Sequence, residues 1–273
     1  MPDEINFNND TGSIDNSPEE LSFSDKIIGV ITSPVITMES VSKHPPKAAN
    51  WLIPIIIFII ISGLASFLYY SNPALKAEME NKSMEAIEKS YQEQVDKGKL
   101  TQQEADEQKE KIMSQMQMGG SFQLIFQVIG VAIYTFLAFF LVNGLFFLFI
   151  KYLMKGDGGF NGTLTAYGLS YYILILQTIV TIILSLAFDK FYIGFSLANF
   201  FDVEWMTFPG FLLRKADPFL IWFYAVLGIS YAKMFNSDNI RKYLILTYSV
   251  WILGNLILYY LSTVSQIFSG FAM

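Results

Sequence analysis

The sequence predicts an all-α polytopic membrane protein with five transmembrane helices and an extramembrane helical hairpin between the first two. Apolar residues make up 53% of the 273 residues and charged residues 15%, whereas soluble domains contain about 25% charged residues. The charges are also separated by long uncharged stretches. The net charge of −6 and the absence of Cys argue against a nucleic-acid-binding protein and against a disulfide-stapled module.

The uncharged stretches define the predicted spans. A helix needs about 20 apolar residues to cross the hydrocarbon core. Four stretches reach that length. The one after Asp217 reaches only about 18 residues, and does so only if Lys233 extends its side chain to the interface and Phe235 is counted. Asp217 and Pro218 are suited to the N-cap and first turn of this shorter helix. The predicted spans are about 51–70, 122–150, 167–188, 218–235 and 243–268.

The distribution of Lys and Arg predicts an N-terminus inside and a C-terminus outside the membrane. The short segments on one side contain eight basic residues, and those on the other side contain three, namely Lys190, Arg214 and Lys215. The long loop 71–121 is left out of this count because long loops cross the membrane largely regardless of charge. The eight residues are Lys26, Lys43, Lys47, Lys151, Lys155, Lys233, Arg241 and Lys242.

Two segments precede the five-span domain, which is predicted to occupy 51–273. Residues 1–23 are acidic and poor in apolar side chains, which predicts a disordered tail rather than a signal peptide. Residues 24–50 contain apolar side chains at helical spacing up to Met38, with Pro34 breaking the helix in two. This amphipathic segment is expected to pack against the spans or to lie in the inner interface, and the two arrangements are compatible with each other.

Residues 74–118 form the one sizeable polar insertion and are rich in helix-forming Glu, Lys, Gln, Ala and Met. Gly98 separates two helical arms, and Thr101 with Glu104 matches a capping box. We expect a solvated helical hairpin outside the membrane, with an oligomerising coiled coil as the alternative.

Residues 191–215 combine eight aromatic residues with several charges, which is typical of the headgroup region. We interpret this segment as interfacial or re-entrant, and a ligand-binding cap over the outer face is the alternative. The predicted interface anchors are Lys43, His44, Lys47, Trp51 and Trp205.

The chain offers few residues for chemistry. His44 is its one histidine, and there is no Cys, so two-His or Cys-based metal sites are excluded. No phosphate loop, dinucleotide fingerprint or calcium loop is present. We therefore predict no catalytic residue, no metal site and no cofactor.

The predicted span interiors hold no ionisable side chain apart from Lys233 at one end, which argues against an ion-coupled pump. The candidate intramembrane polar positions are Asn143, Gln177 and Asn255. Such amides commonly form hydrogen bonds between helices, and a substrate path is the alternative.

The order of several short motifs resembles a known family. Thr32-Ser33-Pro34 and His44-Pro45-Pro46 precede a span that contains Pro54. Later come Phe160-Asn-Gly-Thr-Leu-Thr-Ala-Tyr-Gly-Leu-Ser170 and Val226-Leu-Gly-Ile-Ser-Tyr-Ala232. The chain resembles the Ypt-interacting-protein (Yip) domain family, particularly its prokaryotic branch.

The resemblance implies five spans, a cytoplasmic N-terminus and no enzyme activity. Eukaryotic relatives act in vesicle traffic and contact Rab-type GTPases, whereas the prokaryotic branch has no settled function. The chain has many more Lys than Arg, no Cys and much Asn and Ile, which is compatible with an AT-rich bacterial genome. We therefore expect a multi-pass protein of the bacterial cytoplasmic membrane.

Two functions remain open from the sequence. The first is a non-enzymatic membrane protein that organises membrane or binds protein partners through the acidic tail or the outer hairpin. The alternative is a permease or lipid-translocating transporter for neutral or lipid substrates. The expected partners are the lipid bilayer, protein partners and, as one compatible arrangement, further copies of the chain; nucleic acid is not expected.

Overall fold

All regular secondary structure that the computed structural model describes is helical, as the sequence predicts. The described residues are 20–118, 121–201, 203 and 207–264. The helices are α1 (Phe23–Thr32), α2 (Pro34–Ser42), α3 (Ala49–Ser71), α4 (Pro73–Asp96), α5 (Gln102–Met118), α6 (Ser121–Leu148), α7 (Phe160–Phe188), α8 (Phe208–Lys215), α9 (Pro218–Met234) and α10 (Ile240–Val264). The π-helical turn η1 (Phe149–Leu153) extends α6, and the 3-10 turn η2 (Leu197–Phe200) follows α7.

Within the described residues, four helices are long and apolar enough to cross a membrane, so the protein is a multi-pass membrane protein. They cover Ala49–Ser71, Phe126–Leu153, Phe160–Phe188 and Ile240–Ser262. The helix α9 is apolar but has 17 residues, slightly short of a full crossing. The count of five spans therefore stays a prediction.

The third span shows the largest difference from the predicted boundaries. We placed its start at residue 167, whereas α7 begins at Phe160. Thr163 and Thr165 lower the apolar signal of this first part, yet both side chains are fully buried. The end of α9 covers this part, since a Cβ on Gly162 would lie 3.5 Å from the carbonyl oxygen of Met234.

The helices α3 and α7 cross at Gly168 with almost no space between their backbones. A Cβ at this position would lie 2.3 Å from the Cα of Trp51 and 2.9 Å from the carbonyl oxygen of Asn50. The side chain of Trp51 then stacks on Phe139 of α6, with ring centroids 5.6 Å apart. Three helices therefore pack together around the start of α3.

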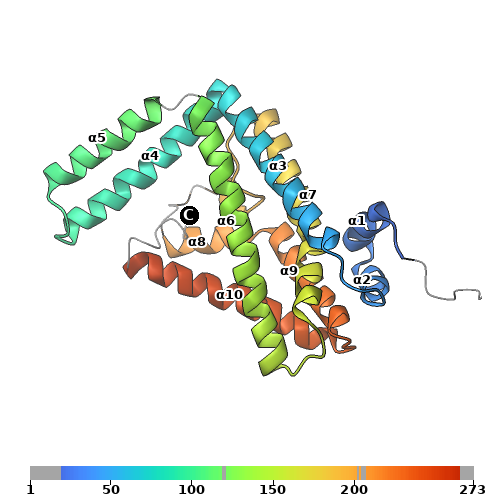
Figure 1. Ribbon diagram of the computed structural model, residues 1–273. Coiled ribbons are helices and arrows are strands. Elements are labelled where there is room, and N and C mark those ends of the chain that lie inside the picture. Colours follow the sequence, from blue (N-terminus) through green and yellow to red (C-terminus); the bar gives the residue numbers. More distant parts are fainter. Residues whose placement is uncertain (1–19, 119–120, 202, 204–206, 265–273) are drawn as a thin grey trace, which may run out of the picture.

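The contacts at the two ends of α3 show that α3 and α7 run in the same direction (Figure 1). Asn50 and Trp51, at the start of α3, lie against Gly168 near the start of α7. At the other end, Asn72 donates a hydrogen bond of 2.8 Å to Asp189, just after α7. We call the end with Asn50, Trp51 and Gly168 the near end of the bundle, and the end with Asn72 and Asp189 the far end.

The helix α9 runs back along α7. Its cap Asp217 lies at the far end beside Gln177 and Phe195, and Met234 lies at the near end beside Gly162. At the near end, the Lys242 side chain at the start of α10 donates a 2.9 Å hydrogen bond to the carbonyl oxygen of Met154. The connections after α6 and after α9 therefore meet at the near end.

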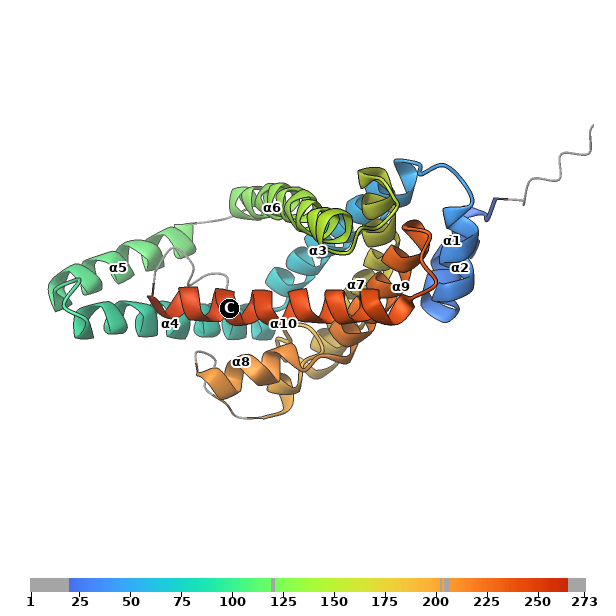
Figure 2. The same cartoon turned by 90° about the horizontal axis from the view of Figure 1, so that it is seen from below.

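The helix α10 takes a different direction from α6. In Figure 2 α6 is seen almost along its axis, whereas α10 runs across the view. Its contact with α9 is close at Gly228, where a Cβ would lie 3.0 Å from the Cα of Leu244. Both long helices expose large apolar side chains such as Leu141 and Leu253, which suits a lipid environment.

The polar helices α4 and α5 form an antiparallel pair that extends away from the bundle at the far end (Figure 1). The capping box is confirmed at the start of α5. The Thr101 N–H donates to the Glu104 carboxylate at 2.8 Å, and the Glu104 N–H donates to the Thr101 hydroxyl at 3.3 Å. Gly98 takes a positive φ of 67° at the turn, which a glycine adopts without strain.

We predict that Gly168→Ala destabilises the bundle by about 1–3 kcal/mol, the usual cost of inserting a methyl group into a well-packed contact. The added Cβ cannot avoid the backbone of α3, because the atoms that it meets belong to Trp51 and Asn50. Thermal unfolding in detergent, followed by circular dichroism, measures the change. Gly130→Ala is the control, since a Cβ there meets no atom within 4 Å. Equal stability of the two variants would contradict the close crossing.

Candidate functional site

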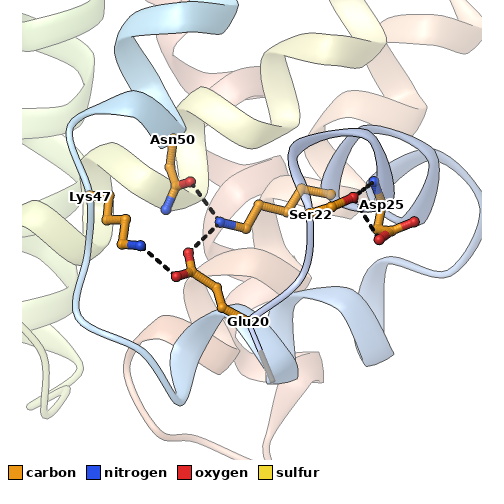
Figure 3. Close-up of polar contacts among 6 residues, drawn as sticks. Glu20, Ser22, Asp25, Lys47 and Asn50 are labelled. Atoms are coloured by element: carbon orange, nitrogen blue, oxygen red, sulfur yellow. Dashed lines mark hydrogen bonds and ion pairs between the residues drawn. The ribbon is translucent and has the colours of Figure 1, made fainter. Parts of the chain in front are cut away.

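A polar junction at the near end joins the N-terminal helices to the bundle (Figure 3). The Lys26 ammonium donates to Glu20 Oε1 at 2.8 Å and to Asn50 Oδ1 at 3.3 Å. The Lys47 ammonium binds the other carboxylate oxygen of Glu20. One carboxylate therefore connects α1 with the loop before α3, and we call this group of four residues the near-end junction.

The electrostatics of the near-end junction follow from the burial of Lys26, which is only 7% exposed. A buried ammonium is stable only with an anionic or hydrogen-bonding partner nearby. Hydrogen bonds from Lys26 and, second, from Lys47 lower the pKa of Glu20 from 4.5 to about 2. The carboxylate is thus ionised at neutral pH and balances the buried cation.

A second carboxylate between two lysines attaches α2 to α9. Glu39 accepts a 3.0 Å ion pair from Lys233, and its other oxygen lies 3.8 Å from the Lys43 ammonium. The hydrogen bond from Lys233, followed by its charge, lowers the pKa of Glu39. Glu39 and Lys43 are more exposed than Lys26, so this contact is the more solvated of the two.

The local sequence shapes the two N-terminal helices. The Ser22 hydroxyl caps α1 by accepting a 3.2 Å hydrogen bond from the Asp25 N–H, and Pro34 starts α2 after the break. Gly29 allows α2 to fold back closely against α1, because a Cβ there would lie 2.2 Å from the Thr37 hydroxyl. Val30 packs into the core, whereas Ile36 is 74% exposed, so the pair has one face on the bundle and one apolar face outside.

A second polar attachment lies at the far end and holds the hairpin. The Glu78 carboxylate accepts a hydrogen bond from the Phe191 N–H, and the Lys82 ammonium donates to the Phe191 carbonyl at 2.9 Å. Glu78 and Lys82 also form an ion pair of 2.9 Å. The Phe191 ring meets Tyr69 edge-on, with centroids 5.5 Å apart. The helix α4 is therefore attached to the loop after α7.

Asp217 organises the rest of the far end. Its carboxylate is 1% exposed and accepts hydrogen bonds from Gln177, from the Phe195 N–H at 2.8 Å and from the Phe219 N–H at 2.8 Å. The N-cap expected from the sequence is confirmed, with Pro218 in the first turn of α9. A buried carboxylate that is fully hydrogen-bonded in this way has a structural role.

The comparison with protein families supplies the identification. The family model of the Yip1 domain matches residues 28–261, which is most of the chain. The chain belongs to the Yip1 domain family. The match confirms the resemblance noted from the short motifs. No curated protein and no solved structure gives a significant match.

The structure of this Yip1 domain does not bring the three predicted intramembrane amides together. Asn143 donates to the Phe139 carbonyl of its own helix at 2.8 Å. Asn255 does the same to the Trp251 carbonyl at 2.7 Å. Gln177 binds Asp217 at the far end. Asn143 and Asn255 are therefore bonded within their own helices, whereas Gln177 bonds to the cap of α9, and the three amides do not form one hydrogen-bonded path.

The predicted interface anchors are partly brought together. Lys43, His44, Lys47 and Trp51 all lie around the near end, and the His44 Nε2 is buried with no hydrogen-bond partner among the described residues. Trp205 lies outside the residues that the structure describes. Within the described residues, no group of three or more His, Cys, Asp or Glu side chains is placed to hold a metal ion.

Sequence reasoning missed the residues on which these sites depend. Glu20 was assigned to the acidic tail and Lys26 to a count of basic residues. Gly168 was quoted within a family motif, without a role at a helix crossing. One signal was available for Glu20, since it comes directly before the first amphipathic helix and its Ser22 cap.

We predict that α1 loosens from the bundle as the pH falls from about 4.5 towards about 2. The folded-state pKa of Glu20 is depressed, so its stabilisation is present above the unfolded value of 4.5 and is lost as the pH falls through the folded value. A spin label on Thr32→Cys, in a chain that has no other Cys, reports the mobility of α1.

Glu20→Gln should make this label mobile already at neutral pH, because Lys26 and Lys47 lose their shared anion. Glu104→Gln is the control, since this carboxyl also has a lowered pKa but lies in the hairpin. Equal label mobility at pH 7 in Glu20→Gln and the parent chain would contradict the role of Glu20.

Proposed function

We propose that this Yip1-domain protein is a non-enzymatic membrane protein that organises membrane or binds protein partners through its polar parts. The observation that carries the proposal is that α3 has a fixed polar attachment at each end. Asn50 belongs to the near-end junction, and Asn72 binds Asp189 at the far end. A rigid helix with anchored polar elements at both ends suits a protein whose surfaces must be held in place relative to the membrane.

The proposal includes an N-terminus in the cytoplasm, a C-terminus outside and a location in the bacterial cytoplasmic membrane. The basic residues support this orientation, because Lys26, Lys47, Lys233 and Lys242 all make contacts at the near end. An excess of Lys and Arg in short loops is the usual mark of the cytoplasmic side. The far end and the hairpin would then face outwards.

The hairpin offers the larger surface for a protein partner. The outward side chains of α5 include Gln103, Glu107 and Glu110, which are exposed, and Tyr91 of α4 donates to Gln108 of α5 at 3.0 Å. Charged, preorganised helix surfaces favour specific and rapid association. Two other interactions are proposed. The chain associates with further copies of itself, and the acidic tail, whose residues 1–19 lie outside the described part, binds protein partners.

A permease for neutral or lipid substrates is the second candidate. The observation that favours it is a set of buried polar atoms, in the described part of the bundle, that lack a hydrogen-bond partner. They are Asn143 Oδ1, Thr163 Oγ1, Thr165 Oγ1, Tyr172 OH and Tyr231 OH. Buried polar atoms normally have a partner, so water or a neutral ligand could satisfy these.

The two functions predict opposite results for two variants. Replacing 74–118 by a short Gly-Ser linker removes the hairpin, and we expect it to abolish most protein cross-links formed in native membranes. The double variant Asn143→Leu/Asn255→Leu should leave these cross-links intact, because both amides bond only to their own helices. Unchanged cross-links in the hairpin deletion, with loss of substrate transport in the double variant, would contradict the scaffold function and favour the permease.

A further inference from the structure

The near-end junction has more hydrogen-bond donors than its carboxylate can satisfy. Two ammonium groups, each with three donors, share the two oxygens of Glu20. His44 Nε2 is buried beside them and has no partner among the described residues. Lys26 and His44 line the same pocket together with Glu20 and Asn50, and Lys47 binds the same carboxylate. Glu20 and Asn50 accept two hydrogen bonds from Lys26 and one from Lys47, so further donors of this group remain for a larger anion.

We propose that the near-end junction is a binding site for a phosphate group, with the headgroup of an anionic phospholipid as its source, and that Glu20 occupies the site in cis when the lipid is absent. A phosphodiester carries one negative charge, as Glu20 does, so exchange preserves the charge balance of Lys26. Its extra oxygens give acceptors for a third donor such as His44. The inference goes beyond partner binding, since it concerns a lipid and a different surface.

The position of the site favours a lipid headgroup. Asn50 and Trp51 stand at the beginning of α3, where the polar loop gives way to a long apolar helix. Lys and Trp at this level are typical of the headgroup region. The outer faces of α1 and α2 also expose the apolar side chains of Ile28 and Ile36, which suits contact with lipid.

The surrounding charges favour an anion once Glu20 leaves. The other acidic groups of α1 and α2 are Glu39, which is paired with Lys43 and Lys233, and Asp25, which accepts a 2.6 Å hydrogen bond from Ser22. Without Glu20 the buried Lys26 and the exposed Lys47 lack an anion. In the described state the residues around the junction enclose no cavity, so the lipid phosphate must displace the Glu20 carboxylate.

Native mass spectrometry of the full chain, titrated with phosphatidylglycerol or phosphatidylcholine, tests the proposal. We expect Glu20→Gln to raise the affinity for phosphatidylglycerol about tenfold, because the competing carboxylate is removed and the lipid phosphate takes its place between Lys26 and Lys47, which holds α1 on the bundle again. The double variant Glu20→Gln/Lys47→Gln should lose this gain. Lys47→Gln alone, at a side chain that is 56% exposed, should bind less phosphatidylglycerol than the parent chain.

Glu39→Gln is the matched control, because it also releases two lysines but at a more solvated position without a buried ammonium. No gain in Glu20→Gln, an equal gain in Glu39→Gln, or a gain that survives Lys47→Gln would overturn the proposal. A parallel titration with inorganic phosphate in phosphatidylcholine distinguishes the source. Binding of inorganic phosphate as tight as that of phosphatidylglycerol would overturn the lipid as the source of the phosphate.

Discussion

The close crossing of α3 and α7 at Gly168 is the constraint on which the other contacts depend. It places the start of α3 against the first part of α7, and the length of both helices then brings Asn72 to Asp189 at the far end. Since α3 and α7 run in the same direction, α6, which lies between them in the sequence, has to run in the opposite direction. The same crossing fixes Asn50, whose side chain accepts a hydrogen bond from Lys26.

Ion pairs at both ends of the bundle attach polar segments to it. Glu20 and Glu39 each lie between two lysines at the near end, and Glu78 pairs with Lys82 at the far end. Exposed ion pairs contribute little to stability, so these contacts act mainly by fixing where the polar elements sit. The buried Lys26 differs, because its charge requires a partner.

Local features could be predicted from the sequence, because neighbouring residues determine them. Pro34 separates α1 from α2, Asp217 caps α9, and Thr101 with Glu104 caps α5. Long-range pairs could not be predicted in this way. Glu20 reaches Lys47, and Gln177 reaches Asp217, only because helices far apart in the sequence meet. The start of α7 was missed because burial among the neighbouring helices, rather than its own hydropathy, makes Thr163 and Thr165 part of the interior.

The structure implies that α3 crosses the membrane and holds a polar attachment on each side. The most direct measurement is the labelling of single cysteines with a membrane-impermeant reagent in intact cells and in inverted vesicles, since the natural chain has no Cys. Ser83→Cys in α4 and Asn161→Cys at the start of α7 are both exposed. We expect Ser83→Cys to be labelled from outside and Asn161→Cys from inside. Labelling of both positions from the same side would contradict it.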